Sequence, residues 1–309
     1  MKSISVFAPA TVANLGCGFD VMGLAIDQPG DELSLSFNRE KKLVIRKITG
    51  DGGKLSYDAK KNTSTVAIQA MLNALKSKQG FDVVLKKKMP LGSGLGSSAA
   101  SAVAGVFAAN ALLGKPFSKR DLVPFAMQGE KLASGAAHAD NVAPCMLGGI
   151  ILIRSYHPLD IIRLPFPKKL FIVVVHPQVE VLTKDARAVL QKNIPIQVAI
   201  QQWGNTAALT AGLFTNDMAL IGRSVEDHVA EPYRAALIPH FKKVKTAALD
   251  QGGIACSISG SGPSVFVLCD GKAKTEKIAS SIKKIFSKNR IKSERYISTV
   301  NDRGVTVLK

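Results

Sequence analysis

The stretch PLGSGLGSSAAS, residues 90–101, sets three glycines two residues apart ahead of a double serine and an alanine-rich run. The segment before it, FDVVLKKKMP, alternates apolar and polar side chains and predicts a half-buried strand. The alanine-rich segment over about residues 97–113 predicts a helix that ends at Gly114. The stretch is therefore predicted to join a strand to a helix.

A glycine-rich junction of this kind can hold phosphate groups. Glycine adopts conformations that other residues resist, and its amide can approach a ligand with no Cβ in the way. The first turn of the helix adds unpaired N–H donors and the positive end of the helix dipole. The hydroxyls of Ser97 and Ser98 lie there, where they can cap the helix, contact phosphate or ligate Mg²⁺. An ordinary Gly/Ser turn stays open, because the spacing of Gly92, Gly94 and Gly96 matches neither GxxxxGK[ST] nor GxGxxG.

The chain length of 309 residues favours two domains that share a cleft. Strand-like and helical segments are mixed along the chain, which predicts an α+β fold. A proline-punctuated segment lies between two apolar strand-like segments, and a boundary there divides the chain into residues 1–160 and 161–309. Ser118 and Asp121 predict a capping box at the start of one helix. The other predicted helices cover residues 65–78, 118–132, 196–214, 232–251 and 275–286.

The formal net charge of +18 has two interpretations, a nucleic-acid partner or a small anionic substrate. The lysines are scattered along the chain. The run Lys86 to Lys88 and the stretch KKIFSKNRIK lack interleaved aromatic residues, and we interpret both as solvated faces. We therefore expect no nucleic-acid partner; weak, uniform and salt-sensitive binding to DNA would favour one.

The sequence also predicts the compartment. No apolar run reaches the roughly 18 residues that a membrane span needs, and MKSISVFAPATVANLG lacks the apolar core of a signal peptide. Cys17, Cys145, Cys256 and Cys269 are widely separated and show no metal-ligand spacing, so buried reduced thiols are expected. We expect a cytoplasmic protein with no membrane partner.

Three glycine-containing stretches resemble, in order, the motifs of the GHMP small-molecule kinases. PLGSGLGSSAAS is similar to the phosphate-binding loop of that family, APATVANLGCGFDVMGLAID to its amino-terminal motif and SISGSGPSVFVL to its carboxyl-terminal motif. HADNVAP, TKDARAVL and EPYRAALIPHF resemble the branch that acts on homoserine. The resemblance covers nearly the whole chain. It implies an amino-terminal domain like domain 2 of ribosomal protein S5, a ferredoxin-like carboxyl-terminal domain and a homodimer.

The resemblance also implies an activity and its cofactors. The expected reaction is the phosphorylation of the L-homoserine side-chain hydroxyl in threonine biosynthesis, with ATP and Mg²⁺. Ser98 and Glu130 match the pair of Mg²⁺ contacts in the family, a hydroxyl and a carboxylate. Asn141 would lie close to the reacting hydroxyl, and these three residues are the catalytic candidates. No dedicated base is expected, because positioning and charge neutralisation carry most of phosphoryl transfer.

Homoserine carries an ammonium and a carboxylate group, so its site needs acidic side chains and guanidinium groups. Arg187 and Arg234 match family positions that bind the carboxylate, and Asp20 and Asp140 are the candidates for the ammonium. The substrate-binding candidates are Asn14, Asp20, His138, Asp140, Thr183, Arg187, Arg234 and Gly260. The nucleotide-binding candidates are Pro90, Leu91, Gly92, Ser93, Gly94, Leu95, Gly96, Ser97, Ser98, Ala99 and Ala100, with Asn62 as an adenine contact.

Other functions stay open on the sequence alone. A kinase of the same family could act on an isoprenoid precursor or a sugar, but such substrates lack the paired α-carboxylate and ammonium that the Arg and Asp candidates suit. A catalytically silent member could bind an amino acid as a sensor, and the presence of Ser98 and Glu130 argues against this. Outside the family, Glu130 would be interpreted as a solvated helix residue and His138 as a structural histidine.

Overall fold

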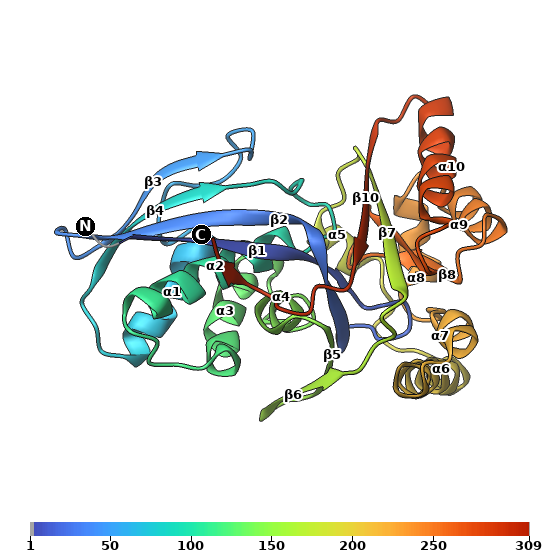
Figure 1. Ribbon diagram of the computed structural model, residues 1–309, viewed down its shortest axis with the longest axis horizontal. Helices are drawn as coiled ribbons and strands as arrows, with labels where there is room; N and C mark the ends of the chain where they lie inside the picture. The colour runs from blue at the N-terminus through green and yellow to red at the C-terminus, as the bar shows by residue number, and fades with distance from the viewer. Residues whose placement is uncertain (1–2, 309) are drawn as a thin grey trace.

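The computed structural model describes residues 3–308, which form two β-sheets covered by helices (Figure 1). The first sheet has seven strands in the order β11-β1-β2-β4-β3, and β5 and β6 extend it from β2. All of its strand pairs are antiparallel except β3 and β4, which a crossover through helix α1 makes parallel. Its strands are β1 (Ser3–Ala13), β2 (Met22–Asn38), β3 (Leu43–Thr49), β4 (Gly80–Lys86), β5 (Ile150–Tyr156), β6 (Leu159–Leu164) and β11 (Thr306–Val307).

Four helices pack on one face of this sheet (Figure 1). They are α1 (Thr63–Ala74), α2 (Ser97–Leu112), α3 (Lys119–Ser134) and α4 (Val142–Leu147). Helix α2 lies against β1 and β2 and is buried on nearly every side, because its alanines let neighbouring elements approach closely. The predicted helix after the glycine-rich stretch is confirmed. The capping box of Ser118 and Asp121 is also present at the start of α3.

The second sheet has the antiparallel order β10-β7-β9-β8. Numbered along the chain, this order is 4-1-3-2, which is typical of a ferredoxin-like domain. Helix α10 buries Ile278, Ile282 and Phe286, which are spaced four residues apart along one face. The elements are β7 (Leu170–Pro177), β8 (Ala255–Ile258), β9 (Val265–Asp270), β10 (Ser293–Thr299), α9 (Phe241–Asp250) and α10 (Thr275–Lys288). The expected α+β architecture is confirmed.

A helical segment connects β7 to α9. It contains α5 (Thr183–Ala188), α6 (Ile196–Thr215), α7 (Met218–Ser224), α8 (Glu231–Arg234) and the 3-10 turn η1 (Ala235–Leu237). The predicted continuous helix over residues 232–251 is wrong, because the chain breaks between η1 and α9. Pro239 cannot donate a backbone hydrogen bond, and His240 adopts a left-handed φ of 61°. None of the helices in residues 3–308 has the length and apolar character needed to cross a membrane.

Strand β6 crosses the predicted division at residue 160. It pairs with β5 over its whole length, so the chain leaves the first sheet between Leu164 and Leu170, where Pro165 and Pro167 lie. The chain later returns to the first sheet, where Thr306 and Val307 of β11 pair with β1. The division of the chain into domains at residues 1–160 and 161–309 stays a prediction. The chain passes from the first sheet to the second between β6 and β7.

Candidate active site

A cleft of about 600 Å³ brings the glycine-rich stretch together with residues from both halves of the chain. Most of the predicted site residues line it. They are Asn14, Asp20, Asn62, Leu91, Gly92, Ser93, Gly94, Gly96, Ser97, Ser98, Glu130, His138, Asp140, Asn141, Thr183, Arg187, Arg234 and Gly260. Pro90, Leu95, Ala99 and Ala100 do not line it, and the side chains of Leu95, Ala99 and Ala100 are fully buried. These three could reach a ligand only through their main chain.

The glycine-rich stretch adopts a conformation that only glycine accepts easily. Gly92, Gly94 and Gly96 have φ angles of +63°, +75° and +68°. Gly96 is the N-cap of α2 and supplies no side-chain cap, so the first amides of this helix keep their capacity to bind an anion. The Ser97 hydroxyl is buried with no hydrogen-bond partner among the described residues. The start of α2 therefore presents unpaired donors to the cleft.

The carboxyl-terminal glycine loop, residues 259–264, holds the glycine-rich loop of residues 90–96 in place; the latter is called the phosphate loop below, after its predicted role. The Ser259 hydroxyl donates to the Gly94 carbonyl at 2.7 Å, and the Ser264 amide donates to the Ser93 carbonyl at 3.2 Å. A Cβ on Gly94 would lie 2.3 Å from the Ser259 carbonyl oxygen. The contact between the two loops therefore fixes the backbone of the phosphate loop from outside.

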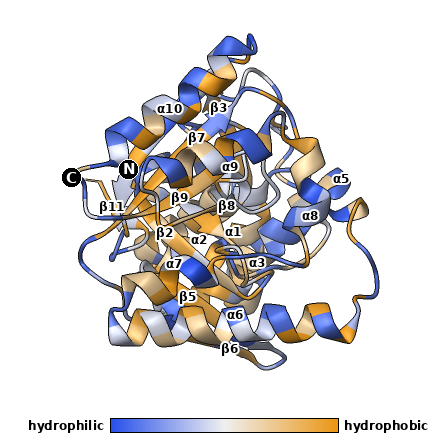
Figure 2. Ribbon diagram, turned by 90° about the vertical axis from the view of Figure 1, so that its right-hand side faces the viewer, coloured by the Kyte–Doolittle hydropathy of each residue, from blue (hydrophilic) through white to orange (hydrophobic). Residues whose placement is uncertain are grey.

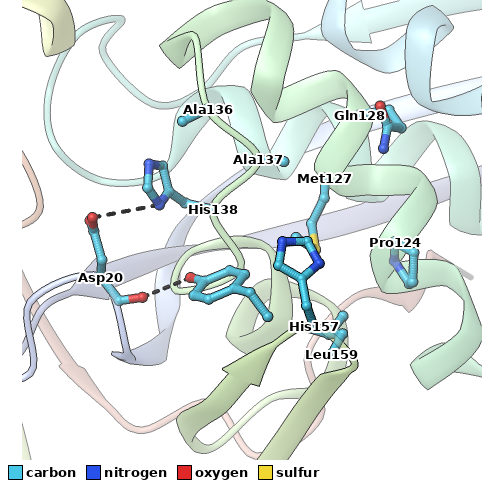
Figure 3. Close-up of a pocket in the computed structure, with 10 residues that line it drawn as sticks. Asp20, Pro124, Met127, Gln128, Ala136, Ala137, His138, His157 and Leu159 are labelled. Carbon is cyan, nitrogen blue, oxygen red and sulfur yellow. Dashed lines mark hydrogen bonds and ion pairs between the residues drawn. The ribbon is translucent and has the colours of Figure 1, made fainter.

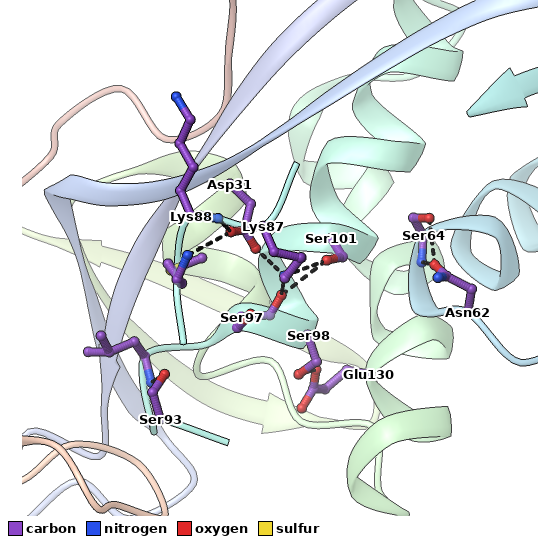
Figure 4. Close-up of polar contacts among 12 residues, drawn as sticks. Asp31, Asn62, Ser64, Lys87, Lys88, Ser93, Ser97, Ser98, Ser101 and Glu130 are labelled. Carbon is purple, nitrogen blue, oxygen red and sulfur yellow. Dashed lines mark hydrogen bonds and ion pairs between the residues drawn. The ribbon is translucent and has the colours of Figure 1, made fainter. Parts of the chain in front are cut away.

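A hydroxyl and a carboxylate meet at the start of α2. The Ser98 hydroxyl donates to Glu130 Oε2 at 2.6 Å, and Glu130 comes from α3 (Figure 4). Both atoms are oxygens that can ligate a metal ion, and they lie at the start of α2, where the free backbone amides are. This pair suits an oxygen-seeking cation such as Mg²⁺, which completes its coordination with waters and phosphate oxygens.

Lys87 lies directly behind the phosphate loop, which contradicts the expectation that the whole run Lys86 to Lys88 is solvated. Its ammonium group pairs with Asp31 and donates to the Ser97 carbonyl at 2.7 Å and to the Ser101 hydroxyl at 2.8 Å (Figure 4). Burial lowers the pKa of Lys87, although Asp31 opposes that shift. The strand pattern could have indicated this position, because Lys87 continues the buried alternation of Phe81, Val83 and Leu85.

We expect Lys87→Met to lower the free energy of unfolding by about 3–5 kcal/mol, because Asp31 would lose its cation inside the protein. The double variant Lys87→Met/Asp31→Asn is expected to recover most of the stability but to keep a raised KM for ATP, since no ammonium then holds the Ser97 carbonyl. Urea unfolding and steady-state kinetics measure the two effects. If the double variant had the same KM for ATP as the wild type, Lys87 would act only as the counter-ion of Asp31.

Another part of the cleft wall is built on a strained turn after β1. Asn14, Leu15 and Asp20 have φ angles of 71°, 46° and 58°, a region that costs energy for residues other than glycine. Asn14 holds this turn, since its Oδ1 accepts from the Asp20 amide at 3.1 Å and its Nδ2 donates to the Gly260 carbonyl at 3.1 Å. The turn thus fixes the Asp20 backbone in the wall of the cleft.

Two arginines converge on the same turn. Arg187 donates to both carboxylate oxygens of Asp20, each at 3.1 Å. Arg234 is almost fully buried and donates to the carbonyls of Ala186 and Gly260, both at 2.9 Å. The Phe19 ring lies 5.7 Å from the Arg187 guanidinium carbon and 5.2 Å from that of Arg234. Burial, with Arg187 nearby, lowers the pKa of Arg234. Sequence reasoning did not identify Phe19.

Asp140 and Asn141 line the same cleft as the two arginines, Ser98 and Glu130. Burial, together with the charges of Asp20 and Glu130, raises the pKa of Asp140 to about 7. The amide oxygen of Asn141 accepts from the Thr11 hydroxyl at 2.6 Å, which leaves the amide nitrogen of Asn141 to donate. Thr11 therefore orients Asn141, and the sequence offered no signal for it, because 130 residues separate the two.

The raised pKa of Asp140 makes stability depend on pH. Between about pH 4 and 7 the folded protein keeps a proton on Asp140 that the unfolded chain has released, so stability falls as pH rises through this window. We expect Asp140→Asn to raise Tm by several degrees at pH 8 and by little at pH 5. Differential scanning calorimetry at both pH values checks this. Equal Tm changes at the two pH values would contradict it.

A second cavity of about 550 Å³ adjoins the cleft behind Asp20 and His138 (Figure 3). His138 Nδ1 lies 3.7 Å from the Asp20 carboxylate, and burial lowers the pKa of His138. The Tyr156 hydroxyl donates to the Asp20 carbonyl at 2.7 Å and accepts from the Ala139 amide at 3.2 Å. Tyr156, which sequence reasoning missed, therefore braces the wall between the two cavities.

Asn62 and Thr183 also line the cleft, at the starts of helices α1 and α5. Asn62 is the N-cap of α1, where its Oδ1 accepts from Ser64 and its Nδ2 donates to the Ser56 carbonyl, so much of its hydrogen-bonding capacity is used. Thr183 is the first residue of α5 and lines the cleft beside Arg187. Both lie where a ligand in the cleft could contact them.

Comparison with known proteins identifies relatives of both halves of the chain. Residues 62–149 match the family model for the GHMP kinases N terminal domain, and residues 208–288 match that for GHMP kinases C terminal. The homoserine kinase of Chlorobium phaeobacteroides is 49% identical over 320 residues, which cover all of both chains. That of Arabidopsis thaliana is 39% identical over 99% of this chain and 85% of its own length.

Solved structures of two kinases also resemble this chain. The homoserine kinase of Cytophaga hutchinsonii superposes with a TM-score of 0.97 and 55% identity, over all of this chain and 98% of its own. An L. major mevalonate kinase in complex with R-mevalonate has a TM-score of 0.72 and 17% identity over 95% of each chain. The second likeness shows the shared fold alone, and the two together confirm the expected two-domain architecture.

Proposed function

The chain belongs to the GHMP kinase family, and we propose on this premise that it transfers the γ-phosphoryl group of ATP to the side-chain hydroxyl of L-homoserine. The products are ADP and O-phospho-L-homoserine, an intermediate of threonine biosynthesis. The observation that carries this function is a single cleft lined both by the phosphate loop and by paired Arg and Asp side chains. Full-length relatives named homoserine kinase support the substrate.

The nucleotide end of the cleft binds the phosphates of ATP. The amides of the loop and of the first turn of α2 donate to phosphate oxygens, and Lys87 holds that turn from behind. Ser98 and Glu130 would hold Mg²⁺, which neutralises charge on the phosphates when it is bound. Asn62 at the edge of the cleft is our candidate for an adenine contact.

The other end of the cleft suits a zwitterion. Asp20 and Arg187 pair with each other without a ligand, so a bound amino acid can replace this internal pair with two matched ones. We assign the substrate carboxylate to Arg187 and Arg234 and the ammonium to Asp20 and Asp140. Asn14, His138, Thr183 and Gly260 complete the wall around it. The exchange of one ion pair for two gives specificity for an α-amino acid.

The reacting hydroxyl then lies between the two ends. Asn141, oriented by Thr11, donates its amide to this hydroxyl or to the transferred phosphoryl group. Asp140 holds the ammonium and is not the base. The rate acceleration comes from in-line positioning and charge neutralisation, which suffice for phosphoryl transfer.

We further propose a cytoplasmic homodimer. The four cysteines are buried and unpaired, which suits a reducing compartment. The formal charge of +18 suits the attraction of anionic ATP, and we assign no nucleic-acid partner.

Truncated substrates test the assignment of charged groups. L-Homoserine is compared with 3-aminopropan-1-ol, which lacks the carboxylate, and with 4-hydroxybutanoate, which lacks the ammonium. We expect kcat/KM to fall at least about 100-fold for each, since each leaves a charged partner unsatisfied. Equal turnover of either analogue would refute the zwitterion site, and tight binding of homoserine without ADP release would favour the amino-acid sensor.

A further inference from the structure

Phe19 is a half-buried aromatic residue that contacts both arginines of the candidate site but takes no part in the proposed phosphoryl transfer. Its ring centroid lies 5.7 Å from the guanidinium carbon of Arg187 and 5.2 Å from that of Arg234, within the range of a cation–π interaction. Arg187 and Arg234 line the cleft, whereas Phe19 does not. The ring can therefore act on a substrate in the cleft through the two arginines.

Apolar packing does not account for a phenylalanine at this position. The buried apolar side chains of residues 3–308 form two clusters, and Phe19 belongs to neither of them. It is also absent from the partly buried apolar residues that pack against these clusters, whereas Val21 of the same turn is one of them. The contacts of Phe19 with two cations are thus a better reason for an aromatic ring here than the filling of a core.

The two arginines carry like charges that the protein compensates only in part. Helices α5 and α8, which carry them, lie side by side (Figure 2), and Arg234 donates to the Ala186 carbonyl of α5 at 2.9 Å. Asp20 pairs with Arg187, whereas the donors of Arg234 go to main-chain carbonyls. Arg187 Nε is buried with no hydrogen-bond partner among the described residues. Burial, with Arg187 nearby, lowers the pKa of Arg234, so this charge needs a stabilising neighbour.

The turn after β1 holds the ring beside the arginines. The Gly18 amide donates to the Asn14 carbonyl at 2.8 Å, and the Met22 amide donates to the Gly18 carbonyl at 2.9 Å. Phe19 and Asp20 are consecutive residues of this turn, and Asp20 is also fixed through its own amide, which donates to Asn14 Oδ1. One short turn therefore supplies both a carboxylate and an aromatic ring to the same pair of guanidinium groups.

An aromatic ring stabilises a cation without occupying its hydrogen-bond donors. A second carboxylate in this place would form an ion pair with the arginines and would repel the carboxylate of a substrate. The face of a phenyl ring carries partial negative charge but no formal charge. We propose that Phe19 is a positioning residue whose ring stabilises the guanidinium groups of Arg187 and Arg234 in the geometry that binds the substrate carboxylate. This inference rests on the proposed homoserine site.

Fluorinated phenylalanines at position 19 test the electrostatic role of the ring. Fluorine withdraws electron density from the ring face and changes the ring size little, so 4-fluoro-, 3,5-difluoro- and 3,4,5-trifluorophenylalanine weaken a cation–π interaction in steps. We expect the Kd and the KM for L-homoserine to rise at each step, by about 10-fold in total, while the KM for ATP stays within about twofold. Isothermal titration and steady-state kinetics measure these constants.

Phe107 is the matched control, because the Lys119 ammonium lies 5.4 Å from its ring centroid and neither residue lines the cleft. The same fluorinated series at position 107 should leave the Kd for L-homoserine within about twofold. Phe19→Leu, which removes the ring, should raise this Kd at least about 10-fold, and Phe19→Tyr, which keeps the ring, should rescue it. Circular dichroism checks that each variant is folded.

The carboxylate assignment has a control of its own. 3-Aminopropan-1-ol lacks the carboxylate that the arginines bind, so its kcat/KM should be the same across the series at position 19. A Kd for L-homoserine that stays constant across this series, or rises equally in the series at position 107, would overturn the role of Phe19 and leave the proposed function intact. Absence of both binding and turnover of L-homoserine in the unsubstituted protein would instead overturn the proposed function and this role with it.

Discussion

Glu130→Gln is expected to lower kcat by about 10³-fold while the KM for homoserine stays within about threefold. The amide keeps the size of the side chain and can still accept from Ser98, but it removes the negative charge that would hold Mg²⁺ against the phosphates. Loss of one preorganised electrostatic contact at a reacting centre typically costs 10²–10³-fold in rate, and misplacement of the cation adds to that cost.

Steady-state kinetics across a Mg²⁺ titration measures this effect. We expect the Mg²⁺ concentration at half-maximal rate to rise in Glu130→Gln, with partial recovery of rate at high Mg²⁺. The matched control is Glu276→Gln on α10, whose carboxylate pairs with Arg295 at the surface far along the chain. A variant with unchanged kcat and unchanged Mg²⁺ dependence would remove Glu130 from the catalytic set.

Arg187→Met should raise the KM for L-homoserine at least about 100-fold and leave the KM for ATP unchanged. The variant removes one guanidinium from the substrate carboxylate and leaves Asp20 without its partner. A lost hydrogen bond to a charged group is worth about 1.5–3 kcal/mol, and Arg187→Met would lose such bonds both to Asp20 and to the substrate carboxylate. Since 1.4 kcal/mol corresponds to tenfold, these values support the expected factor.

An exposed Arg–Asp pair provides the control for this variant. Arg163 pairs with Asp302 at the surface of the first sheet, and Arg163→Met should leave both KM values unchanged. Isothermal titration with homoserine separates binding from turnover. If Arg187→Met bound homoserine as tightly as the wild type, the carboxylate would have to lie elsewhere in the cleft, and Arg234 alone would be the remaining candidate.

The parts of the site that the sequence predicted are those encoded by local patterns. The spacing of Gly92, Gly94 and Gly96 before an alanine-rich helix is a local pattern that predicts a strand–loop–helix junction, and all three glycines have a positive φ. The capping box of Ser118 and Asp121 is equally local. The substrate-binding residues were predicted from the family resemblance. Composition and spacing alone would have indicated only charged residues at the surface.

The parts that were missed depend on contacts between distant segments. Thr11 meets Asn141 across 130 residues, and Phe19 stacks beside Arg234 only because the turn after β1 folds against α8. The lack of interleaved aromatic residues favours a solvated face for the run Lys86 to Lys88, but it gives no sign that Asp31 on the neighbouring strand pairs with Lys87. The false helix over residues 232–251 followed from apolar spacing that ignored Pro239.

ADP release by the purified protein with ATP and Mg²⁺ tests the central claim most directly. L-Homoserine is compared with mevalonate, galactose, L-serine and no acceptor. The variant Arg234→Leu is included because it removes the buried guanidinium group proposed to bind the substrate carboxylate. We predict turnover that requires L-homoserine and is lost in Arg234→Leu, whose folding is checked by its thermal transition. Turnover with mevalonate or galactose but not with L-homoserine would contradict the substrate assignment and leave only the family fold standing.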